Sequence, residues 1–289
     1  MTRHPIGDLR TSGAGVNFPF MSTDSAPLAN IRAAFEEDGY WILEEMLDSD
    51  ELTECATEIE RLHRVAADDA AGASGASFQV EPGADGAQGE RPVLRKIEET
   101  RAVSPVFKRL AEHPKLLEAV RVILGDDLLL FRSTLMLKPA QHGSAHGFHQ
   151  DSAYWPMDPP ALVTVSIALP DADQENGCIQ VIPRSHLWGK QEWGRIGRGA
   201  SEQMTDREDV DTGAAIDVPL KAGSALLFHS LTVHGSRANQ SSRHRNTALY
   251  AYFPPTVRYV PMAGRPREMV YPVISGMEGR TEMTLTASA

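Results

Sequence analysis

The stretch LLLFRSTLMLKP, residues 128–139, is the first of five apolar runs that decide the fold. Each run is long enough for a β-strand and is rich in Val, Ile, Leu or Phe, which strands favour. Pro, Gly, Asp and Asn separate the runs, which continue with ALVTVSIALPD (161–171), GCIQVIPRSH (177–186), GSALLFHSLTVHGS (223–236) and RNTALYAYFPP (245–255). Because no helical segments alternate with them, the pattern predicts an antiparallel sandwich or barrel over residues 127–256.

The segment before these runs, residues 26–126, is predicted to be mainly helical and to pack outside the strands. Its apolar residues follow a helical spacing on either side of YWIL (40–43), which has the character of a short strand. Pro114 and Gly125 mark the beginning and the end of a further helix. We therefore expect one domain of 289 residues, in which residues 257–289 form a C-terminal tail.

Two polar segments interrupt this pattern. Residues Ala66–Glu90 are small, Gly-rich and acidic, and residues Glu192–Ala215 are too long and too polar for a hairpin turn. Such composition is typical of flexible loops, and long loops in compact domains often serve as lids. We expect both segments to lie over the mouth of the barrel and to close when substrate binds.

The composition favours a small molecule as the partner. The chain has a net charge of -11, whereas binding to nucleic acid or to an anionic membrane needs an excess of Lys and Arg. The first 20 residues contain no apolar signal region, and no stretch approaches the roughly 20 apolar residues of a membrane span. Cys55 and Cys178 lie far apart, so we expect no disulfide framework and predict a reducing, cytoplasmic location.

The sequence HGFHQDSAYW (146–155) holds the strongest candidate for chemistry. Side chains alternate between the faces of a strand, so His149 and Asp151 are expected on one side and Gln150 on the other. A third ligand is expected from another strand, and His234 closes the apolar part of the fourth run. Two imidazoles and one carboxylate on one face suit non-haem Fe(II) and leave coordination positions open, although the set does not exclude Zn(II).

The remaining histidines in these runs are expected to have structural or solvent-exposed roles. His142 and His146 precede the strand in a polar loop, and we expect them to be solvated, or one of them to lie beside the ligands. His229 lies five residues before His234, so strand alternation places it on the opposite face as a hydrogen-bonded structural residue.

An ordered set of motifs resembles the phytanoyl-CoA dioxygenase family of Fe(II)- and 2-oxoglutarate-dependent oxygenases. The set consists of FEEDGYWILEEMLDSDEL (35–52), RPVLRKIE (91–98), HQDSAYWP (149–156), ENGCIQVIPRSHLWG (175–189) and HGSRANQSSRHR (234–245). The resemblance covers roughly residues 30–255. It implies a double-stranded β-helix, also called a cupin-like jelly roll, as the core of the protein.

The resemblance also implies the roles of single residues. His149, Asp151 and His234 are implied as iron ligands, and Arg245, eleven residues after His234, as the residue that holds the distal carboxylate of 2-oxoglutarate. The chain reverses direction through GSRANQSS (235–242), so we expect the next strand to run back beside the one that carries His234.

The remaining pocket residues are less well determined. Arg243 and Arg245 share a strand face, so either could reach inward on alternation alone, and only the family spacing favours Arg245. A second carboxylate-binding residue is expected on a neighbouring strand, with Lys138 and Thr134 as equal candidates. Ser166 stands near a position where the family often has a large aromatic residue, so we expect a wider or more polar pocket there.

The implied reaction consumes O2 and 2-oxoglutarate, releases succinate and CO2, and hydroxylates an unactivated carbon of the substrate. Desaturation, cyclisation and epimerisation stay open, because they depend on how the substrate is placed. Halogenation is not expected, because Asp151 occupies the position that a halide would take. Two further hypotheses are a zinc-dependent cupin-type hydrolase or isomerase and a non-catalytic binding module.

We expect the substrate to be a compact metabolite, in secondary-metabolite biosynthesis or tailoring, since the sequence shows no adenine- or pantetheine-binding signature. Arg91, Arg95, Lys96 and Arg101 form a basic cluster. This cluster suits either an anionic substrate or a solvated helix face.

Overall fold

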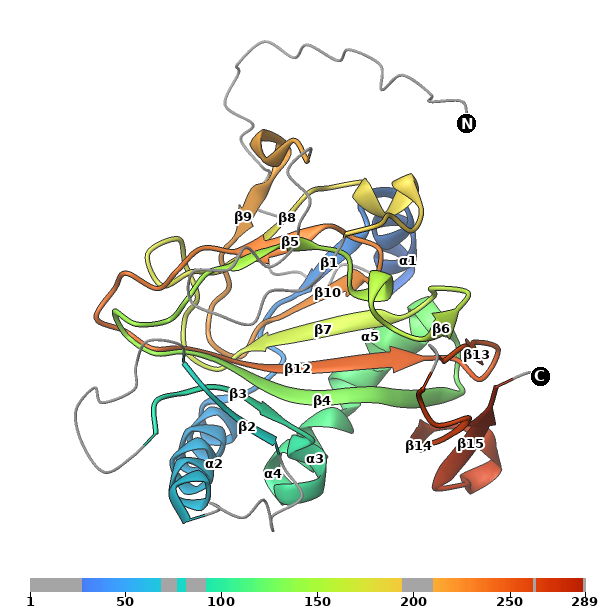
Figure 1. The fold of residues 1–289 in the computed structure, drawn as a ribbon, viewed down its shortest axis with the longest axis horizontal. Helices are drawn as coiled ribbons and strands as arrows, with labels where there is room; N and C mark the ends of the chain where they lie inside the picture. The colour runs from blue at the N-terminus through green and yellow to red at the C-terminus, as the bar shows by residue number, and fades with distance from the viewer. Residues whose placement is uncertain (1–27, 69–76, 82–91, 194–209, 262–263, 288–289) are drawn as a thin grey trace.

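Two facing antiparallel β-sheets form a jelly roll, with helices on the outer side of the larger sheet (Figure 1). The computed structural model describes residues 28–68, 77–81, 92–193, 210–261 and 264–287. The prediction of a mainly β fold with flanking helices is confirmed. In the described residues, no helix combines the length and the apolar character that crossing a membrane requires.

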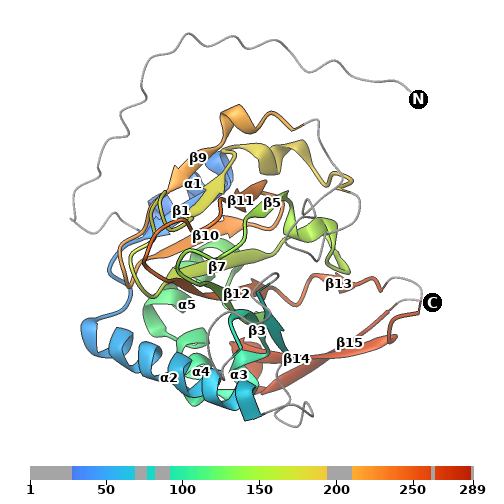
Figure 2. The ribbon, with the colours of Figure 1, turned by 60° about the vertical axis from the view of Figure 1, so that its left-hand side comes forward.

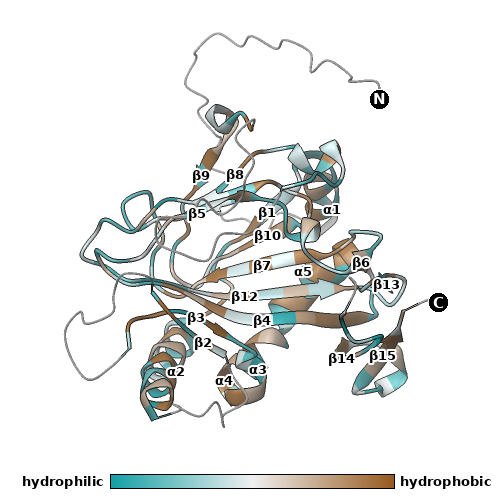
Figure 3. Ribbon diagram, in the orientation of Figure 1, coloured by the Kyte–Doolittle hydropathy of each residue, from teal (hydrophilic) through white to brown (hydrophobic). Residues whose placement is uncertain are grey.

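The helices precede the central strands in the chain. They are α1 (Leu28–Asp38), α2 (Ser49–Asp68), α3 (Thr100–Val103), α4 (Pro105–Ala111) and α5 (Pro114–Leu124). The Asp48 carboxylate accepts the backbone N–H groups of Asp50 and Glu51 and so caps α2. Both apolar and polar residues occur along α2, as Figure 3 shows, and its apolar side faces the core. Pro114 and Gly125 bound α5 as predicted.

The larger sheet has nine strands among the described residues. Their order is β1-β10-β7-β12-β4-β14-β15, and β3 and β2 continue from β4. The strands are β1 (Tyr40–Leu43), β2 (Ser77–Val80), β3 (Leu94–Glu98), β4 (Leu128–Lys138), β7 (Val163–Ala168), β10 (Ala225–His229), β12 (Arg245–Phe253), β14 (Glu268–Ser275) and β15 (Glu282–Thr286).

The smaller sheet has the order β5-β11-β8-β9. It is built from β5 (His146–His149), β11 (His234–Ser236), β8 (Ile179–Val181) and β9 (Ile216–Val218). A separate short pair joins β6 (Met157–Asp158) to β13 (Arg258–Tyr259). In Figure 2 the smaller sheet lies on one side of β7 and β12, and helices α2 and α4 lie on the other.

Alternate residues of the central strands separate the core from the pocket. In β7, Val163, Val165 and Ile167 join the hydrophobic core that the helices cover. The intervening Thr164 and Ser166 point toward the smaller sheet, where the candidate site lies. The two-residue period of a strand therefore gives β7 one apolar face and one face available for ligands.

The path of β12 contradicts one prediction. This strand does not run beside β11; it pairs with β4 and β7 in the larger sheet. The connection after His234 therefore crosses from one sheet to the other, and a turn-rich linker can do this as readily as it can close a hairpin. The alternation of side chains along a strand is the same in either sheet, so it could not show which sheet the strand would join.

Strands also occur where none were predicted. Ser77–Val80 form β2 within a segment expected to be a loop, and residues 257–289, expected to be a tail, contain β13, β14 and β15. These strands are mostly exposed, so they lack the apolar runs that mark the central strands. Residues 69–76, 82–91 and 194–209, which make up most of the two predicted lids, lie outside the described residues.

Candidate metal and cosubstrate site

His149 and His234 lie on neighbouring strands of the smaller sheet. The register of β5 and β11 places the two histidines directly opposite each other, and their ring centroids are 4.3 Å apart. Gly235 permits this close approach, because a Cβ atom there would lie 2.8 Å from the His146 carbonyl oxygen. The prediction that His234 approaches His149 from another strand is confirmed by this pairing.

Backbone carbonyl groups orient both imidazole rings. The Nδ1 atom of His149 lies 2.9 Å from the Gly147 oxygen, and Nδ1 of His234 lies 3.0 Å from the Thr232 oxygen. A carbonyl oxygen can only accept, so in each neutral ring Nδ1 carries the proton and Nε2 keeps its lone pair. The two Nε2 atoms are therefore the ones available to a metal.

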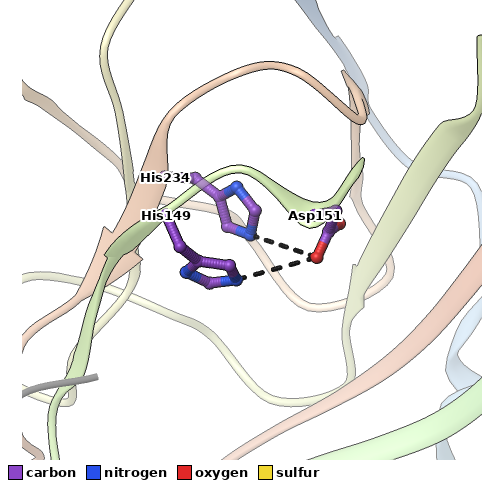
Figure 4. A group of neighbouring side chains, drawn as sticks. All are labelled: His149, Asp151 and His234. Carbon is purple, nitrogen blue, oxygen red and sulfur yellow. Dashed lines mark ion pairs between the residues drawn. The ribbon is translucent and has the colours of Figure 1, made fainter. Parts of the chain in front are cut away.

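The Asp151 carboxylate completes the group, as Figure 4 shows. Its Oδ1 atom lies 3.6 Å from Nε2 of His149 and 4.0 Å from Nε2 of His234. Two ligands that each bind one ion at about 2.1 Å can be at most about 4.2 Å apart, so one ion can reach both pairs. Thr164 donates a 2.7 Å hydrogen bond to the second oxygen, Oδ2, which leaves Oδ1 facing the imidazoles.

Gln150 fixes the backbone between two of these three side chains. Its amide nitrogen donates to the carbonyl oxygens of Gly189 and Leu231, and its amide oxygen accepts from Gln191 N and Trp193 Nε1. The side chain is fully buried. It points away from the metal group, as strand alternation predicted, and it anchors the link between His149 and Asp151 to two distant segments of the chain.

The charge states suit a divalent cation. Burial and the neighbouring His149 lower the pKa of His234 to about 4, so its imidazole is neutral at pH 7. Burial acts to raise the pKa of Asp151, but His234, His149 and Thr164 outweigh burial and lower that pKa to about 2. One carboxylate and two imidazoles in a largely buried position match the donor set of a non-haem iron site.

A cavity of about 770 Å³ extends from this group along the inner face of the larger sheet. Residues paired across β4, β12 and β7 form four rows on that face. From the metal end the rows are Arg132, Ala251 and Thr164; then Thr134, Leu249 and Ser166; then Met136, Thr247 and Ala168; and last Lys138 and Arg245. Successive rows are two residues apart, which is about 6.8 Å along a strand.

Arg245 lies buried in the last row, with 4% of its surface exposed. Its Nε and Nη2 atoms donate to the Gly177 oxygen at 3.0 and 2.7 Å, and Nη1 donates to Thr247 Oγ1 at 3.3 Å. Burial lowers its pKa to about 10, which still leaves it charged at pH 7. No carboxylate of the described residues forms an ion pair with this guanidinium, so a buried positive charge faces the cavity without a counter-ion.

The backbone of Gly177 allows this arrangement. Gly177 has a φ of +78°, and a Cβ atom there would lie 2.4 Å from the Arg237 oxygen. Only glycine fits both conditions without displacing the chain. The resemblance to a known family included this glycine in a motif, but its role in presenting a carbonyl to Arg245 comes from the structure.

Lys138 and Thr134 both line the cavity, in different rows. Lys138 lies opposite Arg245, donates to the Arg237 oxygen, and has its pKa lowered to about 6 by burial and by Arg245. The hydroxyl groups of Thr134 and Ser166 are buried and have no hydrogen-bond partner among the described residues. These two hydroxyls lie in the second row, between the metal group and Arg245, where a ligand could satisfy them.

Arg243, the second arginine expected on this strand face, does not line the cavity. Arg243 is exposed and pairs with Asp173 at 2.6 Å and with Glu175 at 3.5 Å, outside the cavity.

His146 lines the cavity beside His149, and His142 is exposed.

His229 lies on the far side of β10, where its Nδ1 accepts from the backbone of Leu231, as predicted for a structural residue. Of the predicted basic cluster, Arg95 and Lys96 line the cavity, Arg101 pairs with Glu112, and Arg91 lies outside the described residues.

Three functional candidates were missed by sequence analysis: Thr164, Gln150 as an anchor, and Arg132. Thr164 and Arg132 stand at alternate positions of strands whose opposite face is apolar. A polar residue on the inward face of a buried strand is a usable signal, but it needs the strand pairing to show what lies opposite.

Comparison with known proteins places these features in a family. The family model for phytanoyl-CoA dioxygenase (PhyH) matches residues 35–247. An ectoine dioxygenase from Halomonas elongata is 31% identical over 242 residues, which cover 75% of this chain and 67% of that protein. The peroxisomal phytanoyl-CoA dioxygenase of Rattus norvegicus is 23% identical over 257 residues, covering 83% of this chain and 72% of that protein.

A solved structure supports the same assignment. EctD from S. alaskensis with bound Fe aligns with a TM-score of 0.66 and 26% identity, over 85% of this chain and 84% of that one. The iron-bound relative, the family match and the His-Asp-His group agree with one another. The chain is an enzyme that belongs to the phytanoyl-CoA dioxygenase family of iron- and 2-oxoglutarate-dependent oxygenases.

Proposed function

We propose that this enzyme hydroxylates an unactivated carbon of a small metabolite, with His149, Asp151 and His234 as the Fe(II) ligands and Arg245 as the anchor for 2-oxoglutarate. One observation carries the proposal. A buried arginine without a carboxylate partner in the described residues lines the same cavity as a buried His-Asp-His group. A dianionic cosubstrate that binds metal at one end and a guanidinium at the opposite end satisfies both.

The residues between the two ends fit this occupant. Arg245 offers a charge-assisted, bidentate partner for the distal carboxylate, and Lys138 offers a second cation beside it. The unpartnered hydroxyl groups of Thr134 and Ser166 can donate to oxygen atoms of the bound cosubstrate. We rank Lys138 above Thr134 as the second residue for the distal carboxylate, because Lys138 lies opposite Arg245 in the strand register.

Iron with 2-oxoglutarate and O2 supplies the oxidising chemistry, in which succinate and CO2 are released and a C–H bond of the substrate becomes C–OH. The protein's own part is to orient and to exclude water. Carbonyl oxygens hold the His149 and His234 rings by Nδ1, and Thr164 holds Asp151 by Oδ2. Apolar side chains such as Phe228, Ile179 and Leu249 line the cavity beside these groups.

Different outcomes of the same chemistry are the nearest rivals to hydroxylation. Desaturation, cyclisation or epimerisation would need the same ligands and the same anchor, so product analysis must separate them from hydroxylation. Halogenation is disfavoured, because the Asp151 carboxylate occupies the coordination position that a halide needs. A zinc hydrolase has no use for an unneutralised Arg245, which disfavours it, and the intact His-Asp-His group disfavours a non-catalytic binding module.

The cellular setting is part of the proposal. Both cysteines are buried free thiols, which supports a reducing compartment such as the cytoplasm. Secondary-metabolite biosynthesis or tailoring is the proposed context for the substrate.

The proposal is tested by the succinate assay without added substrate. Purified protein with Fe(II), 2-oxoglutarate and O2 should form succinate slowly, and omission of Fe(II) or replacement by Zn(II) should stop it. Incubation with metabolite pools, followed by mass spectrometry, should show a product heavier by one oxygen atom. The absence of succinate under all these conditions would contradict the proposal, and chloride should leave the products unchanged.

A further inference from the structure

A second arginine, Arg132, lines the cavity at the end opposite Arg245. Arg132 stands in the first row of the larger sheet, together with Thr164. Two rows lie between it and the row of Lys138 and Arg245, and the six residues from Arg132 to Lys138 correspond to about 20 Å along the strand. The two arginines therefore stand at opposite ends of the cavity, and we expect them to bind different anionic groups.

Arg132 has no counter-ion in the described part of the chain. Its guanidinium makes no hydrogen bond or ion pair there, and it lies against aromatic rings. The Cζ atom lies 5.6 Å from the centroid of the Trp155 ring and 6.0 Å from that of Phe131. Stacking of this kind holds the planar group in place and leaves its N–H donors directed elsewhere.

Lys96 lies on β3, opposite Met136 of the third row, and its side chain reaches toward Glu98, which lies opposite Thr134 of the second row. Its side chain is largely buried, lines the cavity, and pairs with Glu98 at 2.5 Å. Burial lowers the pKa of Lys96, and the charge of Arg132 acts in the same direction. Arg95 also lines the cavity, so five basic side chains line it together with three carboxylates, those of Glu81, Glu98 and Asp151.

This excess of positive charge contrasts with the whole chain, whose net charge is -11. Arg132 also acts to lower the pKa of Glu99, an acid that does not line the cavity. Lys96 already pairs with Glu98, but Arg132 has no carboxylate partner in the described residues, and a cation without a partner in a cavity costs stability unless an anion binds it. A cleft lined by one sign of charge also concentrates ligands of the opposite sign.

Trp155 indicates what lies next to the anion. The ring is 6% exposed and borders the cavity, four residues after the Asp151 ligand. It therefore offers an apolar surface between Arg132 and the metal group. The backbone of Arg132 lies two strands from Thr164, which corresponds to about 10 Å across the sheet.

We propose that Arg132 and Lys96 form a subsite for an oxyanion of the primary substrate, a carboxylate or a phosphate, whose apolar body lies along Trp155 toward the metal. This proposal rests on the proposed function and names the class of its substrate. The substrate is a compact organic anion, oxidised at a carbon on the order of 10 Å or less from its charged group.

The experiment uses benzoate and phenyl phosphate as probes, with benzamide as the uncharged analogue of benzoate. Binding is measured by calorimetry without oxygen, in protein loaded with Fe(II) and excess 2-oxoglutarate, so that the Arg245 end is filled. At least one anion should bind about tenfold or more tightly than benzamide. Preference for benzoate or for phenyl phosphate then separates a carboxylate from a phosphate as the natural group.

Substitutions locate the binding. Arg132→Met and Lys96→Met keep the apolar stem of each side chain, and each should weaken binding of the preferred anion about tenfold while leaving benzamide unaffected. Arg109→Met is the matched control, because Arg109 is exposed on α4 and pairs with Glu54 away from the cavity. The affinity for 2-oxoglutarate should be unchanged in all three variants.

Several results would overturn the proposal: no binding of either anion, equal binding of benzamide and the anions, or loss of anion binding in Arg245→Met and not in Arg132→Met. The comparison of the probes in the unsubstituted protein stands even if a variant fails to fold. Repeating it without iron and 2-oxoglutarate separates the two proposals. Failure of the subsite leaves 2-oxoglutarate binding and succinate formation intact, whereas failure of the proposed function leaves the anion preference.

Discussion

The two sheets of the barrel contribute to the cavity in different ways. The smaller sheet supplies His149 and His234, whose rings are held by backbone carbonyl groups, so their positions depend on the pairing of β5 and β11. The larger sheet supplies side chains that have few protein partners, such as the hydroxyl groups of Thr134 and Ser166. The imidazole rings of the smaller sheet already have hydrogen-bond partners and are positioned for a metal. The buried hydroxyl groups of the larger sheet lack such partners, which bound ligands would supply.

This difference indicates how one fold can serve different substrates. The metal ligands depend on main-chain geometry, which tolerates little change. The rows on the larger sheet consist of alternate side chains, and a change in one of them alters the cavity without affecting the core on the opposite face. Substitutions in the two sheets should therefore have separable effects.

The largest effect is expected on the smaller sheet. His234→Ala should abolish stoichiometric iron binding and all succinate formation, because two ligands cannot hold the ion in this geometry. Metal content after gel filtration and succinate assays measure both effects. His229→Ala serves as the control, because His229 lies on the far side of its strand and should leave iron content unchanged. Full activity in His234→Ala would refute the assignment of this ligand.

Arg245→Met tests the larger sheet. Loss of a buried charge-assisted pair should raise the dissociation constant of 2-oxoglutarate by tens-fold or more, since removing one partner of such a pair costs about 2–5 kcal/mol. Iron binding should be unaffected, because no metal ligand contacts Arg245. Arg243→Met, which removes an exposed arginine two residues away, should change the dissociation constant less than twofold. Equal increases of the dissociation constant in the two variants would show that 2-oxoglutarate does not depend on Arg245 more than on Arg243.

Thr164→Val tests the contact between the larger sheet and the metal group, because Thr164 belongs to the larger sheet and donates a hydrogen bond to the Asp151 ligand. Without this hydrogen bond the carboxylate can rotate, so iron affinity should fall about tenfold, in the range found for residues that orient metal ligands. Thr164→Ser should restore the affinity. A metal titration measures the change, with Thr53→Val on the exposed side of α2 as the control. Unchanged affinity in Thr164→Val would show that the bond does not position the ligand.

The smallest effect is expected for Lys138→Met, and it concerns the proton that is taken up when 2-oxoglutarate binds. Burial and Arg245 lower its pKa from the ordinary 10.5 to about 6, so at pH 7.5 it is mostly neutral in the empty cavity. A bound carboxylate raises that pKa, so 2-oxoglutarate binding at pH 7.5 should take up close to one proton. Calorimetry in two buffers of different ionisation enthalpy measures this number, which should approach zero in Lys138→Met. No uptake in the unsubstituted protein would place the carboxylate elsewhere.

The same pKa sets a dependence of stability on pH. Between about pH 6 and pH 10 the unfolded chain holds a proton on Lys138 that the folded chain lacks. The free energy of unfolding of the ligand-free protein should therefore receive a contribution from Lys138 that rises with pH across this window. Denaturant titrations at several pH values should show a weaker rise in Lys138→Met. A rise of equal size in both proteins would show that titratable groups other than Lys138 cause the dependence of stability on pH.

The prediction from sequence succeeded where the signal was local. The apolar runs, the helix that begins at Pro114, and the same-side placement of His149 and Asp151 all follow from spacing along one segment. It failed where two segments had to be paired. The strand after His234 joins the larger sheet and not the one that carries His234, and the C-terminal strands lie where no apolar run marks them.

By itself, the sequence determined the class of fold, the three candidate ligands and, through the family spacing, the preference for Arg245. Those features depend on residue type and on distance along the chain. Only the tertiary structure decided which side chains share a row across β4, β12 and β7, that Arg243 faces solvent, and that Arg132 and Arg245 stand at opposite ends of one cavity. The reason is physical: strand alternation gives the face on which a side chain lies, but its neighbours depend on the register between strands far apart in the chain.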